Sequence, residues 1–199
     1  MDIDAACKII ETARGNGVLV ATMGAMFAFD RLNAGQPRIS SVPLMGGAAS
    51  LGLGLALGAP SHKVIVVDGD ASLLMQLGGL ATVADQQPAN LFHFVINNGS
   101  QFSGLSNLAI PAGASVDFAA MAAAAGYRTT FRFDSQEQFA AEAGKILAGK
   151  GPVFVELRVS PPPPMPGASV KIELPDQQFQ RMGEEAKALS AWLKEHSGD

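Results

Sequence analysis

Cysteine is almost absent from this sequence. The one cysteine among 199 residues is Cys7, so an intramolecular disulfide framework is excluded. A cysteine-ligated iron–sulfur cluster is excluded within this chain too, because such a cluster needs several cysteines. We interpret Cys7 as an ordinary helix residue.

Charged residues are also scarce. They make up 16% of the chain, whereas hydrophobic residues make up 48%. The net charge is −4 and the basic residues form no cluster, which argues against nucleic acid as a partner. So little charge predicts that partner subunits cover much of the surface, and we expect self-association as well.

No charged residue occurs between Ile39 and Ser61. Five glycines and two prolines in this stretch argue against a membrane span. We expect a buried helix at 46–58, whose small face packs either in the core or at a subunit interface. The first residues, MDIDAACKII, lack the basic region of a signal peptide, so we expect a cytoplasmic protein.

Apolar runs alternate with helical patterns along the chain. The expected strands are 18–22, 64–67, 91–96, 128–131 and 153–159, and the expected helices are 3–14, 46–58, 71–86, 117–127 and 135–148, with 24–34 a helix or a loop. This alternation predicts an α/β fold, a three-layer α/β/α domain over 1–160 with a mostly parallel sheet. Residues 161–199 are expected to form a proline spacer and a charged helix at 176–195 that packs on the domain or on a partner.

Two polar turns follow neighbouring apolar strands. Asp70 lies in the turn Asp68-Gly69-Asp70-Ala71-Ser72, and Asn98 follows 28 positions later, the length of one strand–helix–strand unit. Because parallel strands end at the same edge of a sheet, the carboxylate and the carboxamide should lie side by side. Oxygen ligands suit Mg2+, and a helix beginning near Ala71 would favour an anion. The pattern predicts a Mg2+-bridged phosphate or diphosphate; the alternative is two ordinary polar turns.

Other polar residues are less informative. Residues 99–114 are rich in glycine, serine and asparagine, and we expect a lid or substrate loop there, or else a simple surface loop. His93 lies inside an apolar strand and is expected to be a core residue, whereas His62 and His196 are expected to face solvent.

Three segments together resemble a known family: Leu44-Met45-Gly46-Gly47, DGDASLLMQLGGLATVA and NNGS. They are similar to the cofactor motif of thiamine-diphosphate (ThDP) enzymes. The closest resemblance is to the short ThDP-binding beta subunit of the sulfopyruvate and phosphonopyruvate decarboxylase group, over residues 18–160. Three departures are Ala71 where glycine is usual, Pro43 where glycine is usual, and the run 101–105. Because the run 101–105 differs, we do not carry over the group's substrate specificity.

The resemblance implies a site. Mg2+ would be held by the Asp70 carboxylate, the Asn98 side chain and the Ser100 backbone carbonyl. Met45 would support the bent cofactor, and backbone groups of Pro43 and Met45 would bond its aminopyrimidine. The implied cofactor-binding residues are Pro43, Met45, Gly69, Ala71, Ser72, Asn98, Ser100 and Gln101.

The resemblance also implies a function, that of the ThDP- and Mg2+-binding subunit of a two-subunit decarboxylase acting on a small 2-oxoacid. ThDP would serve as carbanion and electron sink. The glutamate that activates it belongs, in this family, to a pyrimidine-binding domain for which this sequence has no room, so a partner subunit should supply it and no catalytic residue is assigned here. The alternatives are a ThDP-dependent C–C ligase or lyase subunit, as in acetolactate-synthase-like enzymes, and a non-catalytic scaffold.

The substrate can be narrowed only slightly. No lysine or arginine occurs between Lys63 and Arg128. A sulfonate or phosphonate tail calls for a cation. Either the partner supplies that cation, or the substrate is an aliphatic or aryl 2-oxoacid.

Overall fold

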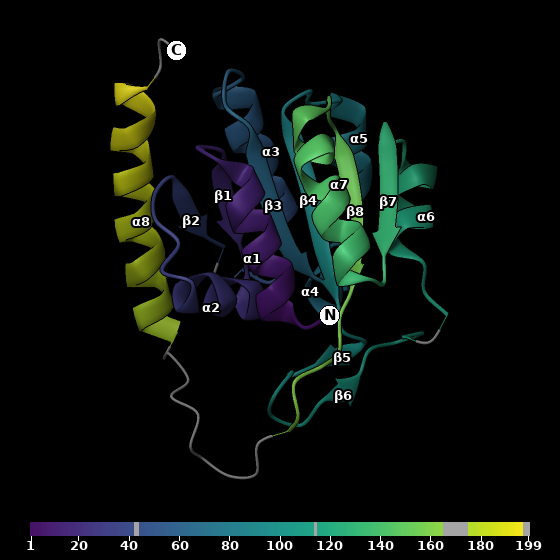
Figure 1. Ribbon diagram of the computed structural model, residues 1–199. Coiled ribbons are helices and arrows are strands. Elements are labelled where there is room, and N and C mark those ends of the chain that lie inside the picture. Colours follow the sequence, from purple (N-terminus) through teal and green to yellow (C-terminus); the bar gives the residue numbers. More distant parts are fainter. Residues whose placement is uncertain (42–43, 114, 165–174, 197–199) are drawn as a thin grey trace.

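A six-stranded sheet, parallel throughout, forms the centre of the computed structural model (Figure 1). The structure describes residues 1–41, 44–113, 115–164 and 175–196. The strand order is β2-β1-β3-β4-β8-β7. The strands are β1 (Val18–Ala21), β2 (Arg38–Ser40), β3 (Val64–Gly69), β4 (Leu91–Asn97), β7 (Thr129–Phe133) and β8 (Val153–Arg158).

Helices cover both faces of the sheet, which confirms the predicted three-layer α/β/α fold. One face carries α1 (Ile3–Arg14), α2 (Met23–Arg31) and α7 (Gln136–Ala148), and the other carries α3 (Ala48–Gly58), α4 (Asp70–Met75), α5 (Gly79–Gln86) and α6 (Phe118–Ala125). The central strands are continuous apolar runs because both of their faces are buried. In the described part of the chain, none of the helices combines the length and the apolar character that a membrane crossing requires.

One expected helix was wrong, one strand was missed, and one side chain was expected in the wrong environment. The predicted helix over 71–86 is broken into α4 and α5, because Gln76 ends the first helix and Gly78 precedes the second. The strand β2 was not predicted, since it is only three residues long and begins with Arg38. His62, which was expected to face solvent, is buried and its ring packs edge-on against Trp192.

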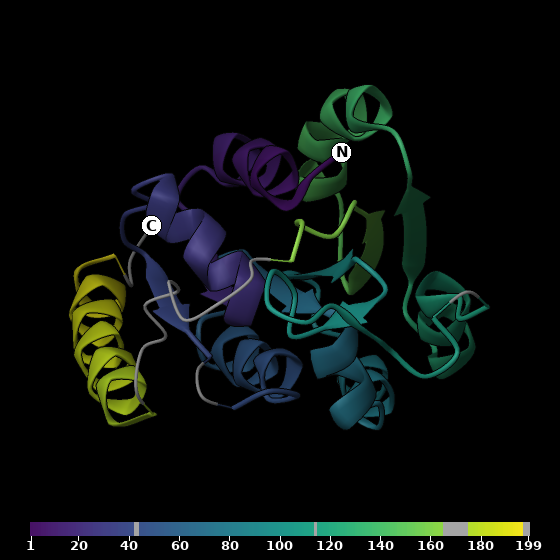
Figure 2. The same cartoon turned by 90° about the horizontal axis from the view of Figure 1, so that it is seen from below.

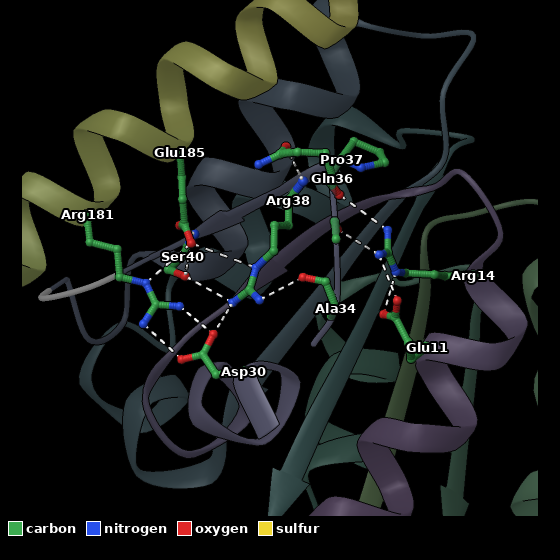
Figure 3. A network of polar contacts seen from close by, with 11 residues as sticks. Glu11, Arg14, Asp30, Ala34, Gln36, Pro37, Arg38, Ser40, Arg181 and Glu185 are labelled. Atoms are coloured by element: carbon green, nitrogen blue, oxygen red, sulfur yellow. Dashed lines mark hydrogen bonds and ion pairs between the residues drawn. The ribbon is translucent and has the colours of Figure 1, made fainter. Parts of the chain in front are cut away.

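The C-terminal helix α8 (Pro175–Glu195) lies along β2, the edge strand of the sheet (Figures 1 and 3). The Glu185 carboxylate accepts hydrogen bonds from the backbone N–H and the hydroxyl of Ser40, the latter at 3.2 Å. The Arg181 guanidinium makes two hydrogen bonds to Asp30, one of 2.8 Å, and Asp30 also pairs with Arg38 at 3.0 Å. The helix therefore satisfies a donor on an edge strand that another chain could otherwise pair with.

A short antiparallel hairpin lies at the carboxyl ends of the sheet strands. Figure 2 shows this end of the sheet in a view along the strands. It is formed by β5 (Ser100–Gln101) and β6 (Leu108–Ala109). The Asn107 side chain donates a hydrogen bond of 2.8 Å to the Pro162 carbonyl, so the hairpin is held against the proline run that leaves β8. Phe102, Asn107 and Ala112 all have positive φ, a conformation that is uncommon for residues other than glycine.

Candidate functional site

Asp70 stands at the junction of β3 and α4 and is 2% exposed. One oxygen of its carboxylate, Oδ1, accepts a hydrogen bond of 2.7 Å from the Ala71 N–H. The other, Oδ2, accepts one of 2.6 Å from the Gly99 N–H, in the turn after β4. Since β3 and β4 are adjacent and parallel, one carboxylate joins both of the polar turns, so the two turns meet at one edge of the sheet as their spacing predicted.

The Asp70 carboxylate is unusual because it is buried and, in the part of the chain that the structure describes, has no cationic partner. Burial raises the pKa of Asp70, and the N–H groups of Ala71 and Gly99 offset part of that rise. Within the described ranges, no lysine, arginine or histidine forms an ion pair with it. A cation bound here would compensate the buried negative charge, so the chemistry of the site fits a hard metal ion.

Asn98 lies beside Asp70, but its side chain bonds within its own loop. Its Oδ1 accepts hydrogen bonds from the Ser100 N–H at 2.9 Å and from the Ser100 hydroxyl at 3.0 Å. Its Nδ2 donates to the Ser103 hydroxyl at 2.7 Å. The structure thus brings Asp70, Asn98 and Ser100 together, while their role as metal ligands stays a prediction.

The donor set also limits which metal fits. The described residues hold no group of three histidine, cysteine or acidic side chains that could bind a metal ion on their own. One carboxylate with amide and carbonyl oxygens suits Mg2+, which usually completes its coordination with water and phosphate oxygens. This arrangement fits a metal bound together with a diphosphate better than a metal bound alone.

Ser72 connects α4 to the loop before α3. Its hydroxyl is buried and accepts a hydrogen bond of 2.8 Å from the Gly46 N–H. Gly46 has a φ of +85°, and a Cβ there would lie 2.8 Å from the Gln76 Cβ, so no other residue fits without a shift. The loop that contains Met45 is therefore fixed next to Asp70. Pro43 lies outside the described residues.

Several residues near this loop are free to contact a ligand or a partner. The Ser41 hydroxyl, just after β2, is buried without a hydrogen-bond partner among the described residues. Gly69, Ala71 and Gln101 are half-buried at the same edge of the sheet. Large apolar side chains are exposed around α3, the α4–α5 connection and the hairpin: Leu44, Met45, Leu57, Met75, Leu77, Phe102, Leu105 and Leu108.

Buried polar residues behind the turns were not predicted from the sequence. Asp68 accepts a hydrogen bond of 2.8 Å from the Gly69 N–H, and Asn97 donates one of 2.7 Å to Glu156. A signal for Glu156 was present, namely an acidic residue inside the apolar run VFVELR. His93 is a core residue as expected, and its ring Nδ1 lies 3.1 Å from the Tyr127 hydroxyl.

Comparison with known proteins identifies relatives over more than half of the chain. The family model described as thiamine pyrophosphate enzyme, C-terminal TPP binding domain, matches residues 17–157; thiamine pyrophosphate and TPP are other names for ThDP. A phosphonopyruvate decarboxylase from Streptomyces viridochromogenes is 42% identical over 120 residues, which cover 60% of this chain and 30% of that protein. The sulfopyruvate decarboxylase subunit beta from Methanocaldococcus jannaschii is 32% identical over 150 residues, which cover 73% of this chain and 76% of that protein.

A solved structure agrees with the fold. The ThDP-dependent 4-hydroxybenzoylformate decarboxylase of Rhodococcus jostii RHA1 superposes with a TM-score of 0.68 at 19% identity, over 81% of this chain and 33% of that protein. The matched region thus spans about a third of the phosphonopyruvate decarboxylase and of this solved structure, but about three quarters of the archaeal beta subunit.

Proposed function

Because this chain belongs to the thiamine pyrophosphate enzyme family, as its C-terminal TPP binding domain, we propose that it is the ThDP- and Mg2+-binding subunit of a 2-oxoacid decarboxylase. The observation that carries the proposal is the buried Asp70 carboxylate, which joins the turn after β3 to the turn after β4 and pairs with no cationic side chain among the described residues. The names of the relatives, sulfopyruvate and phosphonopyruvate decarboxylase, support the reaction class.

The proposed metal ligands are the Asp70 carboxylate, the Asn98 side-chain oxygen and the Ser100 backbone carbonyl. For Asn98 this role requires its Oδ1 to exchange at least one of its bonds to Ser100 for the metal. Gly69, Ala71, Ser72 and Gln101 line the same edge and would contact the diphosphate. Met45, held beside them through the bond between Gly46 and Ser72, would support the aminopyrimidine together with Pro43.

When bound, ThDP supplies the carbanion that adds to the 2-oxoacid and the electron sink that accepts the electrons left by CO2. The residues of this chain hold and orient the cofactor rather than transfer protons. The Ala71 and Gly99 N–H groups hold both carboxylate oxygens of Asp70 in place and so orient this proposed ligand. We assign no acid or base to this chain.

A separate subunit is proposed to supply the pyrimidine-binding domain and its activating glutamate. The Methanocaldococcus jannaschii relative, of which the match covers 76%, is itself named as a subunit beta. The exposed apolar side chains around Leu44, Met75 and Phe102 lie on the elements that carry the site, and such a surface is typical of a protein interface. We propose that the partner docks there and closes the site from that side.

The proposed division of the site between two subunits also bears on the class of substrate. No lysine or arginine lies between Lys63 and Arg128, the part of the chain that forms the turns and the hairpin. A cation for a sulfonate or phosphonate tail would therefore come from outside this segment, and we propose that the partner supplies it if the substrate carries such a tail. Turnover of sulfopyruvate and of aryl 2-oxoacids by the purified complex distinguishes an anionic from an apolar substrate, and product analysis separates decarboxylation, which gives aldehydes, from ligation, which gives hydroxyketones.

The test is an Asp70→Ala variant of this chain, isolated with its accompanying subunits. We expect loss of ThDP retention in the presence of Mg2+ and a fall in turnover of at least about 100-fold, since the variant removes a ligand. Asp85→Ala is the matched control, because Asp85 is an exposed aspartate on the neighbouring helix α5. Full activity of the Asp70→Ala variant, or full activity of this chain without any partner, would contradict the proposal.

A further inference from the structure

A buried glutamate lies one strand away from the proposed metal site and touches none of its ligands. We propose that Glu156 is a positioning residue that fixes the loop Asn98–Ser100 through Asn97. This inference rests on the proposed Mg2+ and ThDP site, and it gives the first asparagine of the Asn97-Asn98 pair a function of its own.

Glu156 is fully buried in β8, on the sheet face covered by α6. Its Oε1 accepts a hydrogen bond of 2.7 Å from Asn97 Nδ2 and one of 3.3 Å from Arg158 Nε. Its Oε2 accepts one of 3.2 Å from the Ala119 N–H, in the first turn of α6. One side chain thus ties together the end of β4, the end of β8 and the start of α6.

The three groups around Glu156 are all donors: a carboxamide NH2, a backbone N–H and a guanidinium N–H. Only a group that accepts at both of its oxygens satisfies all of them, and among side chains of this length that group is a carboxylate. A glutamine would turn an NH2 group toward at least one donor. The position therefore requires glutamate rather than any polar residue of similar size.

Asn97 is the last residue of β4, and it is held at two points. Its side chain bonds Glu156, and its backbone carbonyl accepts a hydrogen bond of 2.9 Å from the Val159 N–H. The next residues are the proposed ligand Asn98 and Gly99, whose N–H reaches Asp70 Oδ2 at 2.6 Å. The position of Asn97 at the end of β4 is therefore fixed, and its bond to Glu156 sets the direction of the loop Asn98–Ser100 that follows.

The experiment measures the affinity for Mg2+ by calorimetric titration of the metal-free complex with Mg2+, in a solution that contains excess ThDP. The variants are Glu156→Gln, Asn97→Ala and the double substitution, each in the full chain isolated with its accompanying subunits. We expect each single variant to bind Mg2+ about 10- to 100-fold more weakly, as is usual when a residue that orients a metal ligand is changed. Because the two residues act through one bond, the double variant should be hardly weaker than either single variant.

The Asn97→Ala variant keeps the inference testable if Glu156→Gln does not fold, since it leaves two donors on Glu156. Asp30→Asn serves as the control for a loss of stability alone, because Asp30 bonds to Arg181 and Arg38 and not to the proposed Mg2+ ligands or to Glu156. It should lower the melting temperature without changing Mg2+ affinity. Mg2+ affinities of the Glu156 and Asn97 variants within twofold of wild type, or effects that add in the double variant, would overturn the inference. Absence of Mg2+-dependent ThDP binding in the wild-type complex would overturn the proposed function itself.

Discussion

At the scale of single residues, the site depends on a few side chains that each hold two parts of the chain. Asp70 joins two turns, Ser72 joins α4 to the loop before α3, and Glu156 joins two strands and a helix. The sequence predicts the position of Asp70 and Asn98, because the length of one strand–helix–strand unit is fixed. It does not predict the bonds of Glu156, because its partner Asn97 is 59 positions away in the chain.

The packing of α3 against the sheet predicts how alanine at Gly52 changes the stability of the chain. A Cβ at Gly52 would lie 2.2 Å from Val66 Cγ2, on the central strand β3. Gly52→Ala should therefore lower the free energy of unfolding by about 1–3 kcal/mol, as overpacking of a core does. Urea denaturation of the chain measures the change.

Gly54 is the matched control in the same helix. Nothing lies within 4 Å of a Cβ built there, and the residue is exposed. Gly54→Ala should raise the stability of the chain by about 0.5–1 kcal/mol, because alanine loses less backbone entropy in a helix. The same variant should weaken binding of the partner subunit if this face of α3 is covered in the complex. Equal destabilisation by both substitutions would contradict the packing described for α3.

At the scale of elements, the periodicity of apolar residues predicted the long helices and strands, but it missed short strands that are held by contacts with other parts of the chain. The helix expected over 3–14 is α1, and the strand expected over 91–96 is β4, because each has a clear pattern of apolar residues. The three residues of β2 have no such pattern, and they form a strand because β1 on one side and α8 on the other satisfy their backbone groups. The hairpin of β5 and β6 was expected only as a loop, since two-residue strands leave no signal in the sequence.

The docking of α8 on β2 predicts a dependence on pH. Burial alone would raise the pKa of Asp30, but the guanidinium groups of Arg181 and Arg38 outweigh it and lower that pKa below the ordinary value of 3.8. The ionised aspartate therefore contributes stability that is present above pH 3.8 and is lost as the pH falls through its lowered pKa.

Hydrogen exchange of the α8 amides in wild type and in Asp30→Asn tests this dependence. Near pH 7 the variant should exchange faster, and at a pH below the pKa of Asp30 the two proteins should become alike once intrinsic rates are taken into account. Exchange that is equally slow in both proteins at neutral pH would show that the ion pairs do not hold the helix.

At the scale of the whole molecule, the composition and the exposed surface favour our proposal that the chain is one part of a larger assembly. Its charged residues amount to 16%, and eight large apolar side chains are exposed on the elements around the proposed site. The described residues provide oxygen atoms for a metal ion but, in our assignment, no group that activates the cofactor. Both features are explained if a second subunit covers this surface and completes the site.

Native mass spectrometry of the protein isolated from its own source with Mg2+ present tests this central claim most directly. The account predicts a hetero-oligomer that contains a second type of subunit and one ThDP for each copy of this chain. Removal of Mg2+ by a chelator should release the cofactor without unfolding the subunits. An assembly of this chain alone, without ThDP, would contradict the account and would favour a non-catalytic scaffold that keeps the fold.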